Sequence, residues 1–351
     1  MSKPIVVLDP HWRQLDEIFS PDDLATLGSM CELVWARDEP MPRKVLEDHL
    51  ATMSILIAAR PALDASDLAN APKLRAVIEV SGAFPDTIDY AACFDRGVHV
   101  LSCAPGFRAS VAEMAVAMAL AGARGLVQEH EAFRGGSEHW LSDNVATDFS
   151  LYGQTIGFVG FGSIARECSR LLMPFGPRIL AYDPWLKHEQ FQEHSAVQTT
   201  LDDVMRCSRC LFVAATPTHE NKGLIDAEAI AKMPRGALLV LISRAHLVDF
   251  DALVAAVREH RIRAAIDVFP TEPVANDDAV RSLPNAILSP HRAAAVRGGR
   301  QLIGRMIVED VANLLRGQAP INLQPATPEK VARSAGAGHA TGTLTLALAR
   351  R

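Results

Sequence analysis

The chain has 351 residues, of which 49% are hydrophobic and 22% charged, and its formal net charge is −6. A chain of this length is expected to form two domains, and its composition is sufficient for buried cores without crosslinks. The acidic balance, with no basic block in the folded part, argues against nucleic acid as a main partner.

The sequence also argues against a secreted or membrane protein and against a metal-binding protein. The opening run Ile5–Leu8 is too short for a signal peptide, and no run of about 18 apolar residues could span a membrane. We therefore expect a cytoplasmic protein with no membrane partner. Cys207 and Cys210 are the one close cysteine pair, but they lead into a predicted strand, so we predict no metal site.

Short apolar runs alternate with helical segments from the beginning of the chain. Ile5–Leu8, Ile55–Ala58 and Ala76–Val80 are predicted strands, and Pro42–Thr52 has helical spacing. This alternation is typical of a parallel sheet with helices on both faces. Ser110–Val127 is nearly all Ala, Val, Met and Leu, which predicts a buried helix that would suit close packing against a second subunit.

A second alternating series begins after a polar loop around residues 135–148. Its predicted strands and helices are Thr155–Gly160, Ser163–Phe175, Ile179–Tyr182, Cys210–Ala214, Leu238–Ile242, Ala264–Val268, Ala286–Leu288 and Ile303–Arg316. Their spacing is that of successive βα units, so the predicted fold class is α/β with two doubly wound parallel-sheet lobes. Residues 327–351 turn to Ala, Gly, Thr, Ser and Arg, and we expect a mostly disordered tail there.

A glycine-rich turn marks the candidate cofactor site. Gly160-Phe-Gly162-Ser-Ile-Ala165 follows an apolar strand and opens a helix, which is the G-x-G-x-x-G/A dinucleotide pattern in its required context. Gly160 permits the tight turn, and Gly162 lets a pyrophosphate approach the backbone at the helix N-terminus. Without that context, an ordinary glycine turn would be the alternative.

An acid about 20 residues further on strengthens this interpretation. Asp183 ends the next strand, where a carboxylate accepts hydrogen bonds from the adenosine ribose and repels a 2′-phosphate. The expected cofactor is therefore NAD rather than NADP. Further candidate cofactor-binding residues lie in the turn and at following strand ends: Ser163, Ile164, Ala214, Ala215, Thr216 and Ile242.

Charged groups follow three later strands, where ligands of open α/β sheets bind. Arg244 follows Leu238–Ile242, Glu272 follows the strand Ala264–Val268, and His291 follows Ala286–Leu288. Reduction of a 2-oxo acid needs a proton donor near neutral pH, which His supplies, and a planar cation for the carboxylate, which suits Arg. A neighbouring carboxylate would orient the imidazole and hold its charged form.

The same residues carry a family resemblance. The chain resembles the D-isomer-specific 2-hydroxyacid dehydrogenases over roughly residues 50–322. The matching stretches are Gly153–Gly162, Lys222–Asp226, Pro234–Ala237, Ser243–Asp249, Asp267–Phe269 with Glu272-Pro273, and Pro284-Asn285 leading to Ser289-Pro-His291.

The resemblance implies specific roles and a discontinuous domain order. Arg244 would bind substrate, His291 would be the acid/base with Glu272 as its partner, and Asp267 would hold the nicotinamide carboxamide. Residues 1–104 and 293–326 would form a flavodoxin-like substrate-binding domain around a Rossmann NAD-binding domain at 105–292. The reaction would be D-stereospecific hydride transfer at C2 of a small 2-hydroxy or 2-oxo acid, by a homodimer.

The chain departs from the family in the substrate loop, where Ser81-Gly-Ala83-Phe84-Pro85 has Phe84 in place of a second glycine. Ala83 and Phe84 are candidate substrate-binding residues, because backbone N–H groups of this loop hold the substrate carboxylate in the family. A ring there and Pro85 would favour compact or apolar 2-oxo acids over phosphorylated or dicarboxylic ones. The alternative is that Phe84 points into the lobe core.

Three other functions remain open at this stage. A phosphoglycerate dehydrogenase is a narrower form of the same activity. A non-catalytic NAD(H)-sensing protein of the same fold, similar to transcriptional corepressors, would tolerate loss of the proton donor, whereas this chain keeps Arg244, Glu272 and His291. An unrelated reaction on a Rossmann scaffold is disfavoured by the joint order of the motifs.

Overall fold

The computed structural model describes residues 3–140, 148–296 and 298–334. The chain divides into two compact units. The first unit holds the residues up to Arg108 and returns at Ala294, and the second unit holds Ala109–Ala293. These exchange points lie close to the predicted boundaries at 104/105 and 292/293, and the second unit is inserted into the first.

The first unit contains a sheet of six strands with order β13-β5-β4-β3-β1-β2, parallel except for β13. From β2 to β5 this is the flavodoxin-like order. Its elements are β1 (Ile5–Asp9), α1 (Leu15–Ile18), α2 (Pro21–Met30), β2 (Glu32–Trp35), α3 (Arg43–His49), β3 (Met53–Ala58), α4 (Ala65–Ala69), β4 (Ala76–Glu79), α5 (Tyr90–Asp95), β5 (His99–Ser102), η1 (Ala104–Phe107), α13 (Gln301–Leu315), β13 (Gln324–Pro325) and α14 (Pro328–Ser334).

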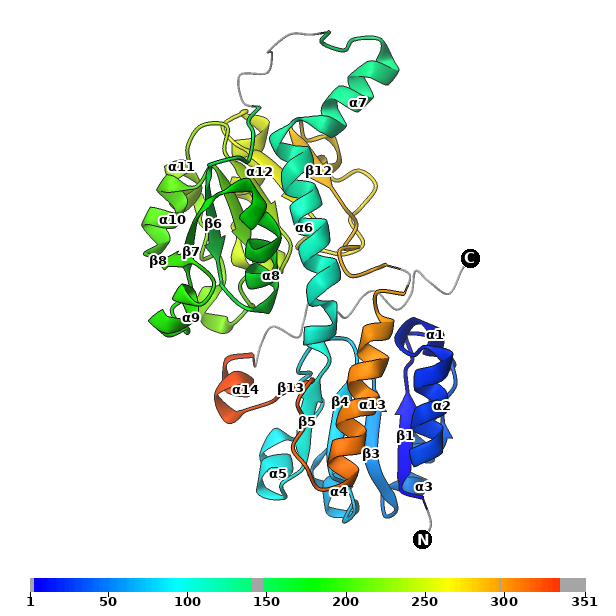
Figure 1. Ribbon diagram of the computed structural model, residues 1–351. Coiled ribbons are helices and arrows are strands. Elements are labelled where there is room, and N and C mark those ends of the chain that lie inside the picture. The colour runs from blue at the N-terminus through cyan, green and yellow to red at the C-terminus, as the bar shows by residue number, and fades with distance from the viewer. Residues whose placement is uncertain (1–2, 141–147, 297, 335–351) are drawn as a thin grey trace. The chain divides into compact units, whose positions relative to one another are not determined.

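Helices cover both faces of this sheet, because its central strands are apolar on both sides. All six residues of β3 are buried. Helices α1, α2 and α13 gather on one face, as Figure 1 shows. A Cβ on Gly304 of α13 would lie 2.5 Å from the carbonyl oxygen of Ile18, so glycine allows α13 to approach α1 this closely.

The predicted tail is wrong at its beginning. Residues 328–334 form α14, and Val331 packs against the core cluster on the α3–α5 face. Two hydrogen bonds fix the chain where this helix begins. The N–H of Ala326 donates to the carbonyl of Val100 at 2.8 Å, and the hydroxyl of Thr327 accepts from the N–H of Lys330 at 3.3 Å. The remainder of the predicted tail, residues 335–351, lies outside the described residues.

The second unit contains a fully parallel sheet of seven strands with order β12-β11-β10-β9-β6-β7-β8. This is the Rossmann order with one added strand, and the fold-class prediction is confirmed. Its elements are α6 (Arg108–Ala123), α7 (Leu126–Gly135), β6 (Thr155–Val159), α8 (Ser163–Leu172), η2 (Met173–Phe175), β7 (Arg178–Tyr182), α9 (His188–Gln192), β8 (Ala196–Gln198), α10 (Leu201–Cys207), β9 (Cys210–Val213), η3 (His219–Asn221), α11 (Ala227–Lys232), β10 (Leu238–Leu241), η4 (Ala245–Leu247), α12 (Phe250–Arg258), β11 (Arg263–Ile266), η5 (Ala279–Ser282) and β12 (Ala286–Leu288).

The long apolar helix ends earlier than predicted. α6 stops at Ala123, and Gly125, with φ +58°, separates it from α7, because the left-handed conformation breaks the helix. Among the described residues, the helical stretch Ala104–Ala123 is long and apolar enough to cross a membrane by those two criteria alone, but half of it is buried in the protein. Arg263 of β11 fixes the end of α6 by donating to the carbonyl of Gly122 at 2.8 Å.

Candidate functional site

The glycine-rich turn lies between β6 and α8, as predicted. Gly160 has φ +83°, and a Cβ there would lie 2.3 Å from the Cα of Ala215, so only glycine fits. Gly162 is the N-cap of α8, is exposed, and a Cβ on it would meet nothing within 4 Å. The N-terminal turn of α8 therefore faces open space, where its free N–H groups fit a pyrophosphate.

Asp183 follows β7 and lies against this turn. One of its oxygens accepts from the N–H of Phe161 at 2.8 Å, and the other from the N–H of Trp185 at 3.0 Å. A carboxylate has about four acceptor sites, so Asp183 keeps capacity for ribose hydroxyls. The carboxylate thus fits the ribose of a dinucleotide whose pyrophosphate lies at α8.

The other candidate cofactor residues lie near the same sheet edge. Ala214, Ala215 and Thr216 follow β9, and the N–H of Ala214 donates to Val159 at 2.9 Å. Ser163 and Ile164 form the first turn of α8. Ile242 is buried directly after β10, and the next residue, Ser243, donates from its hydroxyl to Val213 at 3.0 Å.

The predicted acid/base pair is in contact. Nδ1 of His291 lies 2.6 Å from Oε2 of Glu272, and the other carboxylate oxygen of Glu272 accepts from the N–H of Phe269 at 2.9 Å. An ionised carboxylate only accepts, so the Nδ1 atom carries the proton and Nε2 is left to face a reacting group. His291 has φ +53°, an uncommon conformation that its N–H supports by donating to Ser289 at 2.9 Å.

The structure holds Glu272 in its ionised form. Burial raises the pKa of Glu272, but the hydrogen bonds from His291 and Phe269 and the charges of His291 and Arg244 outweigh it. The pKa of Glu272 is therefore lower than the ordinary value of 4.5. The stability that ionised Glu272 contributes is therefore fully present above pH 4.5, its ordinary pKa. This stability is lost as the pH falls through the lower pKa that Glu272 has in the folded protein.

Arg244 follows β10 and belongs to the same electrostatic group. Its side chain reaches solvent, and its Nη1 donates to the carbonyl of Ser243 at 2.7 Å. Surrounding protein atoms lower the pKa of Arg244, and the charge of Glu272 opposes this effect. The guanidinium nevertheless stays cationic at neutral pH, because arginine does not lose its proton in proteins.

Asp267 has a structural role within its own unit. It is fully buried, and its carboxylate accepts from the hydroxyl of Ser289 and from the N–H groups of Arg292 and Ala293, the latter two at 2.9 and 3.1 Å. These donors flank His291 in the loop after β12. Asp267 thus anchors the histidine loop, and its role toward the nicotinamide carboxamide stays a prediction.

The loop after β4 in the first unit also differs from expectation. The N–H groups of Ser81, Gly82 and Ala83 donate to Glu79 at 2.6, 2.8 and 2.7 Å, and the hydroxyl of Ser81 donates to it as well. Glu79 is fully buried, and this burial raises its pKa despite those hydrogen bonds. Of the two candidate substrate-binding residues of this loop, Ala83 thus already donates its N–H to Glu79.

Phe84 packs inward. It is half-buried and contacts the core cluster on the α3–α5 face of the first unit, whereas Ala83 is exposed. This favours the alternative in which Phe84 belongs to the lobe core. The predicted preference for compact or apolar substrates therefore loses the contact on which it depended.

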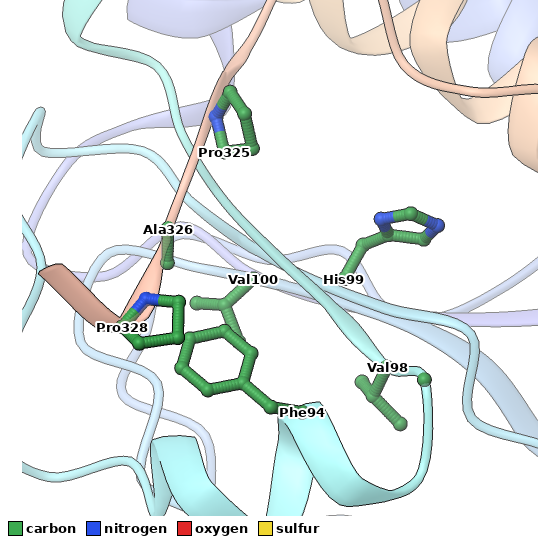
Figure 2. A pocket seen from close by; sticks show the side chains of 8 residues that line it. Phe94, Val98, His99, Val100, Pro325, Ala326 and Pro328 are labelled. Carbon is green, nitrogen blue, oxygen red and sulfur yellow. The ribbon is translucent and has the colours of Figure 1, made fainter. Parts of the chain in front are cut away.

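A pocket of about 280 Å³ in the first unit carries no candidate site. Figure 2 shows its lining, in which the side chains of Phe94 and Val100 lie near Pro328. The residues before β5 contribute to it, so it lies toward the amino end of that strand rather than at the ligand-binding edge. His99 is its single titratable residue. Among the described residues, no group of three or more His, Cys, Asp or Glu side chains could hold a metal ion.

Comparisons with known proteins decide the family. Residues 116–293 match the family model described as D-isomer specific 2-hydroxyacid dehydrogenase, NAD binding domain. A glyoxylate reductase from Pyrococcus horikoshii is 31% identical over 298 residues, which cover 83% of this chain and 88% of that protein. The chain belongs to the D-isomer-specific 2-hydroxyacid dehydrogenase family. The family resemblance and the NAD-binding domain predicted from the sequence are thereby confirmed.

Other relatives in this family are named for phosphoglycerate rather than glyoxylate. A D-3-phosphoglycerate dehydrogenase from Mycobacterium tuberculosis is 31% identical over 319 residues, which cover 91% of this chain but 58% of that enzyme. The chain thus spans little more than half the length of that relative. A crystal structure of a phosphoglycerate oxidoreductase from Rhizobium etli superposes with a TM-score of 0.82 at 37% identity, covering 93% of this chain and 99% of that one.

Proposed function

We propose that this dehydrogenase-family protein transfers a hydride between NAD and C2 of a small D-2-hydroxy or 2-oxo acid. The observation that carries the proposal is the 2.6 Å contact between His291 and Glu272. It lies in the unit that holds the glycine-rich turn, and Arg244 interacts electrostatically with Glu272. A proton donor, its carboxylate and a cation are the groups that reduction of a 2-oxo acid requires.

In the reducing direction, bound NADH supplies the hydride that adds to C2. Arg244 would bind the substrate carboxylate and polarise the C2 carbonyl, because its planar fork matches both oxygens. As the carbonyl oxygen gains negative charge, Nε2 of His291 would donate its proton to that oxygen, and the product is the 2-hydroxy acid. Glu272 keeps Nδ1 protonated and the ring oriented throughout.

The chief alternative is a non-catalytic NAD(H)-sensing protein of the same fold. Such a protein has no use for a paired proton donor, whereas here Glu272, with its lowered pKa, contacts His291. Phosphoglycerate dehydrogenase activity is the narrower form of our proposal. It is supported by the 31% identical mycobacterial relative, which is a D-3-phosphoglycerate dehydrogenase.

We also propose a homodimer formed through the second unit, in the cytoplasm. α7 exposes Leu126 at 61% and Phe133 at 60%, and Trp140, which follows this helix in the chain, is 71% exposed and lies edge-on to the ring of Phe133. Apolar groups exposed together suit a subunit interface. Size-exclusion chromatography with light scattering would test this, and a monomeric mass at micromolar concentration would contradict it.

A screen of 2-oxo acids with NADH, followed at the nicotinamide absorbance, tests the activity. We expect oxidation of NADH with at least one 2-oxo acid, and the product should be the D-2-hydroxy acid by chiral chromatography. NADH binding without turnover of any 2-oxo acid would favour the sensing alternative.

Cofactor choice should follow from Asp183. The wild type should have a higher kcat/KM with NADH than with NADPH, because a carboxylate repels a 2′-phosphate in a partly desolvated site. Asp183→Asn should narrow this difference while keeping an oxygen to accept from the N–H of Phe161. Equal kcat/KM values for both cofactors in the wild type would contradict the assignment.

The pH profile should report the contact between Glu272 and His291. Because its pKa lies below the ordinary value of 4.5, Glu272 is ionised at neutral pH and orients His291 through the 2.6 Å contact. Glu272→Gln should therefore reduce 2-oxo acids more slowly than the wild type at neutral pH, and the difference should shrink as the pH falls through the pKa of Glu272, where the wild type loses its ionised carboxylate. The measurement is kcat/KM against pH in the reducing direction, and superimposable profiles would refute the pairing.

A further inference from the structure

Two side chains tie the segment that carries Arg244 to the end of β9 and to the loop after it. The hydroxyl of Ser243 donates to the carbonyl of Val213 at 3.0 Å, and Nε2 of His246 lies 2.8 Å from the carbonyl oxygen of Thr218. A carbonyl oxygen only accepts, so this contact assigns the proton of the neutral His246 ring to Nε2. Arg244 thus stands between two side-chain hydrogen bonds, one residue after the first and two residues before the second.

Backbone hydrogen bonds and burial fix the main chain around His246. The N–H of Gly223 donates to the carbonyl of His246 at 2.9 Å. The N–H of Ile225 donates to the carbonyl of Leu247, also at 2.9 Å. Ala245 and Leu247 are buried on either side of His246, whereas His246 itself is half-buried. Because the main chain is fixed in this way, only the side-chain torsions remain to be ordered by the contact of the ring.

The loop that accepts from the His246 ring begins with the candidate cofactor residues 214–216. Asn221 holds this loop from its other side. Its Nδ2 donates to the carbonyl of Thr216 at 2.8 Å, and its Oδ1 accepts from the N–H of Thr218 at 2.8 Å. These two contacts stay within the loop, whereas the contact of His246 joins the loop to the segment of the substrate-binding arginine.

We propose that His246 is a positioning residue that holds Arg244 in a fixed place beside the cofactor loop. The inference rests on the proposed function, in which Arg244 binds the C1 carboxylate and the C2 carbonyl. Nη1 of Arg244 donates to the carbonyl of Ser243 at 2.7 Å, so the main chain of this segment orients the guanidinium. A shift of the segment therefore shifts the guanidinium, and a bidentate contact tolerates little misalignment.

His246→Ala tests the proposal, with NADH as cofactor and glyoxylate and hydroxypyruvate as substrates. KM should rise and kcat/KM should fall by roughly 10-fold, the change that loss of one net hydrogen bond produces. The Kd of NADH, from fluorescence titration, should stay near its wild-type value because Asn221 still holds the cofactor loop. His246→Gln should recover most of the loss, because its amide N–H can replace the ring N–H as donor. A glutamine variant no better than the alanine variant would contradict the proposal.

The same substitution in a chain without the Arg244 guanidinium separates positioning from a general structural role. If His246 acts through Arg244, adding His246→Ala to Arg244→Met should change kcat/KM by less than about twofold. A general disturbance of the fold would lower kcat/KM in both backgrounds. Equal fold-losses in the wild-type and Arg244→Met backgrounds would therefore overturn the inference and leave the proposed function intact.

His49→Ala is the matched control for removing a histidine ring. His49 is half-buried on α3 of the first unit, and its Nδ1 lies 2.8 Å from the carbonyl oxygen of Val45. The control variant thus also removes a contact between a ring nitrogen and a backbone carbonyl. It should leave kcat, KM and the Kd of NADH at their wild-type values.

Hydrogen exchange, followed by mass spectrometry, tests the contact without turnover. His246→Ala should speed exchange in the peptide that contains residues 243–249, and His246→Gln should keep it near the wild-type rate. Identical exchange in the wild type and the alanine variant would overturn the inference. If neither glyoxylate nor hydroxypyruvate is reduced, exchange still decides whether His246 holds this segment. Failure of the whole screen of 2-oxo acids would count against the proposed function alone.

Discussion

Replacing His291 with asparagine should lower kcat for 2-oxo acid reduction by roughly 10²–10⁴-fold, the usual contribution of general acid–base catalysis. The asparagine amide cannot act as an acid at neutral pH, because it does not release its protons. Asparagine does tolerate the left-handed conformation that His291 adopts, with φ +53°. The backbone of the loop should therefore be kept. NADH affinity, measured by fluorescence titration, should stay near its wild-type value because the turn at Gly160 is untouched.

The chain offers a closely matched control. His260 also has φ +53° and is exposed, and it precedes β11 at the opposite end of the sheet, where Nδ2 of Asn285 contacts its ring at 2.6 Å. His260→Asn applies the same substitution to the same backbone conformation and should leave kcat unchanged. If His291→Asn reduces 2-oxo acids at nearly the wild-type rate, His291 is not the proton donor and the sensing alternative gains support.

The strands that position the site could be predicted because each is an apolar run followed by a glycine or a polar residue. β6, β10 and β12 were located to within a residue or two, and with them the places of Gly160, Arg244 and His291. Other strands gave no such signal. β8 has three residues, two of them exposed, and β2 has no buried residue, so neither shows an apolar run.

The uses of individual carboxylates could not be predicted. Asp267 and Glu79 both end or follow apolar strands, and the sequence gives no means of knowing that loop N–H groups satisfy them. In Glu79 a signal was present, because an acid at the end of the apolar run Ala-Val-Ile is unfavourable to bury without donors. The Ser-Gly that follows one residue later could have indicated those donors.

The burial of Arg13, in the loop after β1, gave no signal in the sequence at all. Arg13 stands in a polar, aromatic loop where an arginine is ordinarily exposed. Its burial arises from Phe107 and Arg300, which are far away in sequence and reach it only through the parallel order of β1, β4 and β5 and the return of α13. Long-range contacts of this kind are set by topology, so local patterns do not report them.

Replacing Arg244 with methionine should lower kcat/KM for every 2-oxo acid by roughly 10²–10³-fold. The reason is that truncating one partner of a hydrogen-bonded charge pair costs about 2–5 kcal/mol. All 2-oxo acids share the C1 carboxylate and C2 carbonyl that Arg244 would bind, so the loss should not depend on the distal group.

Two further variants show whether the loss in Arg244→Met comes from the charge or from the shape of the guanidinium, and whether it is specific to this position. Arg244→Lys should recover only part of the loss, because an ammonium is a point charge and cannot present two parallel N–H groups to a carboxylate. Arg206→Met removes an exposed arginine of the same unit, paired with Asp202 on α10, and should leave kcat/KM unchanged. Full recovery by lysine would mean that charge alone matters at position 244. A methionine variant with wild-type kcat/KM and unchanged NADH binding would place the substrate carboxylate on another group.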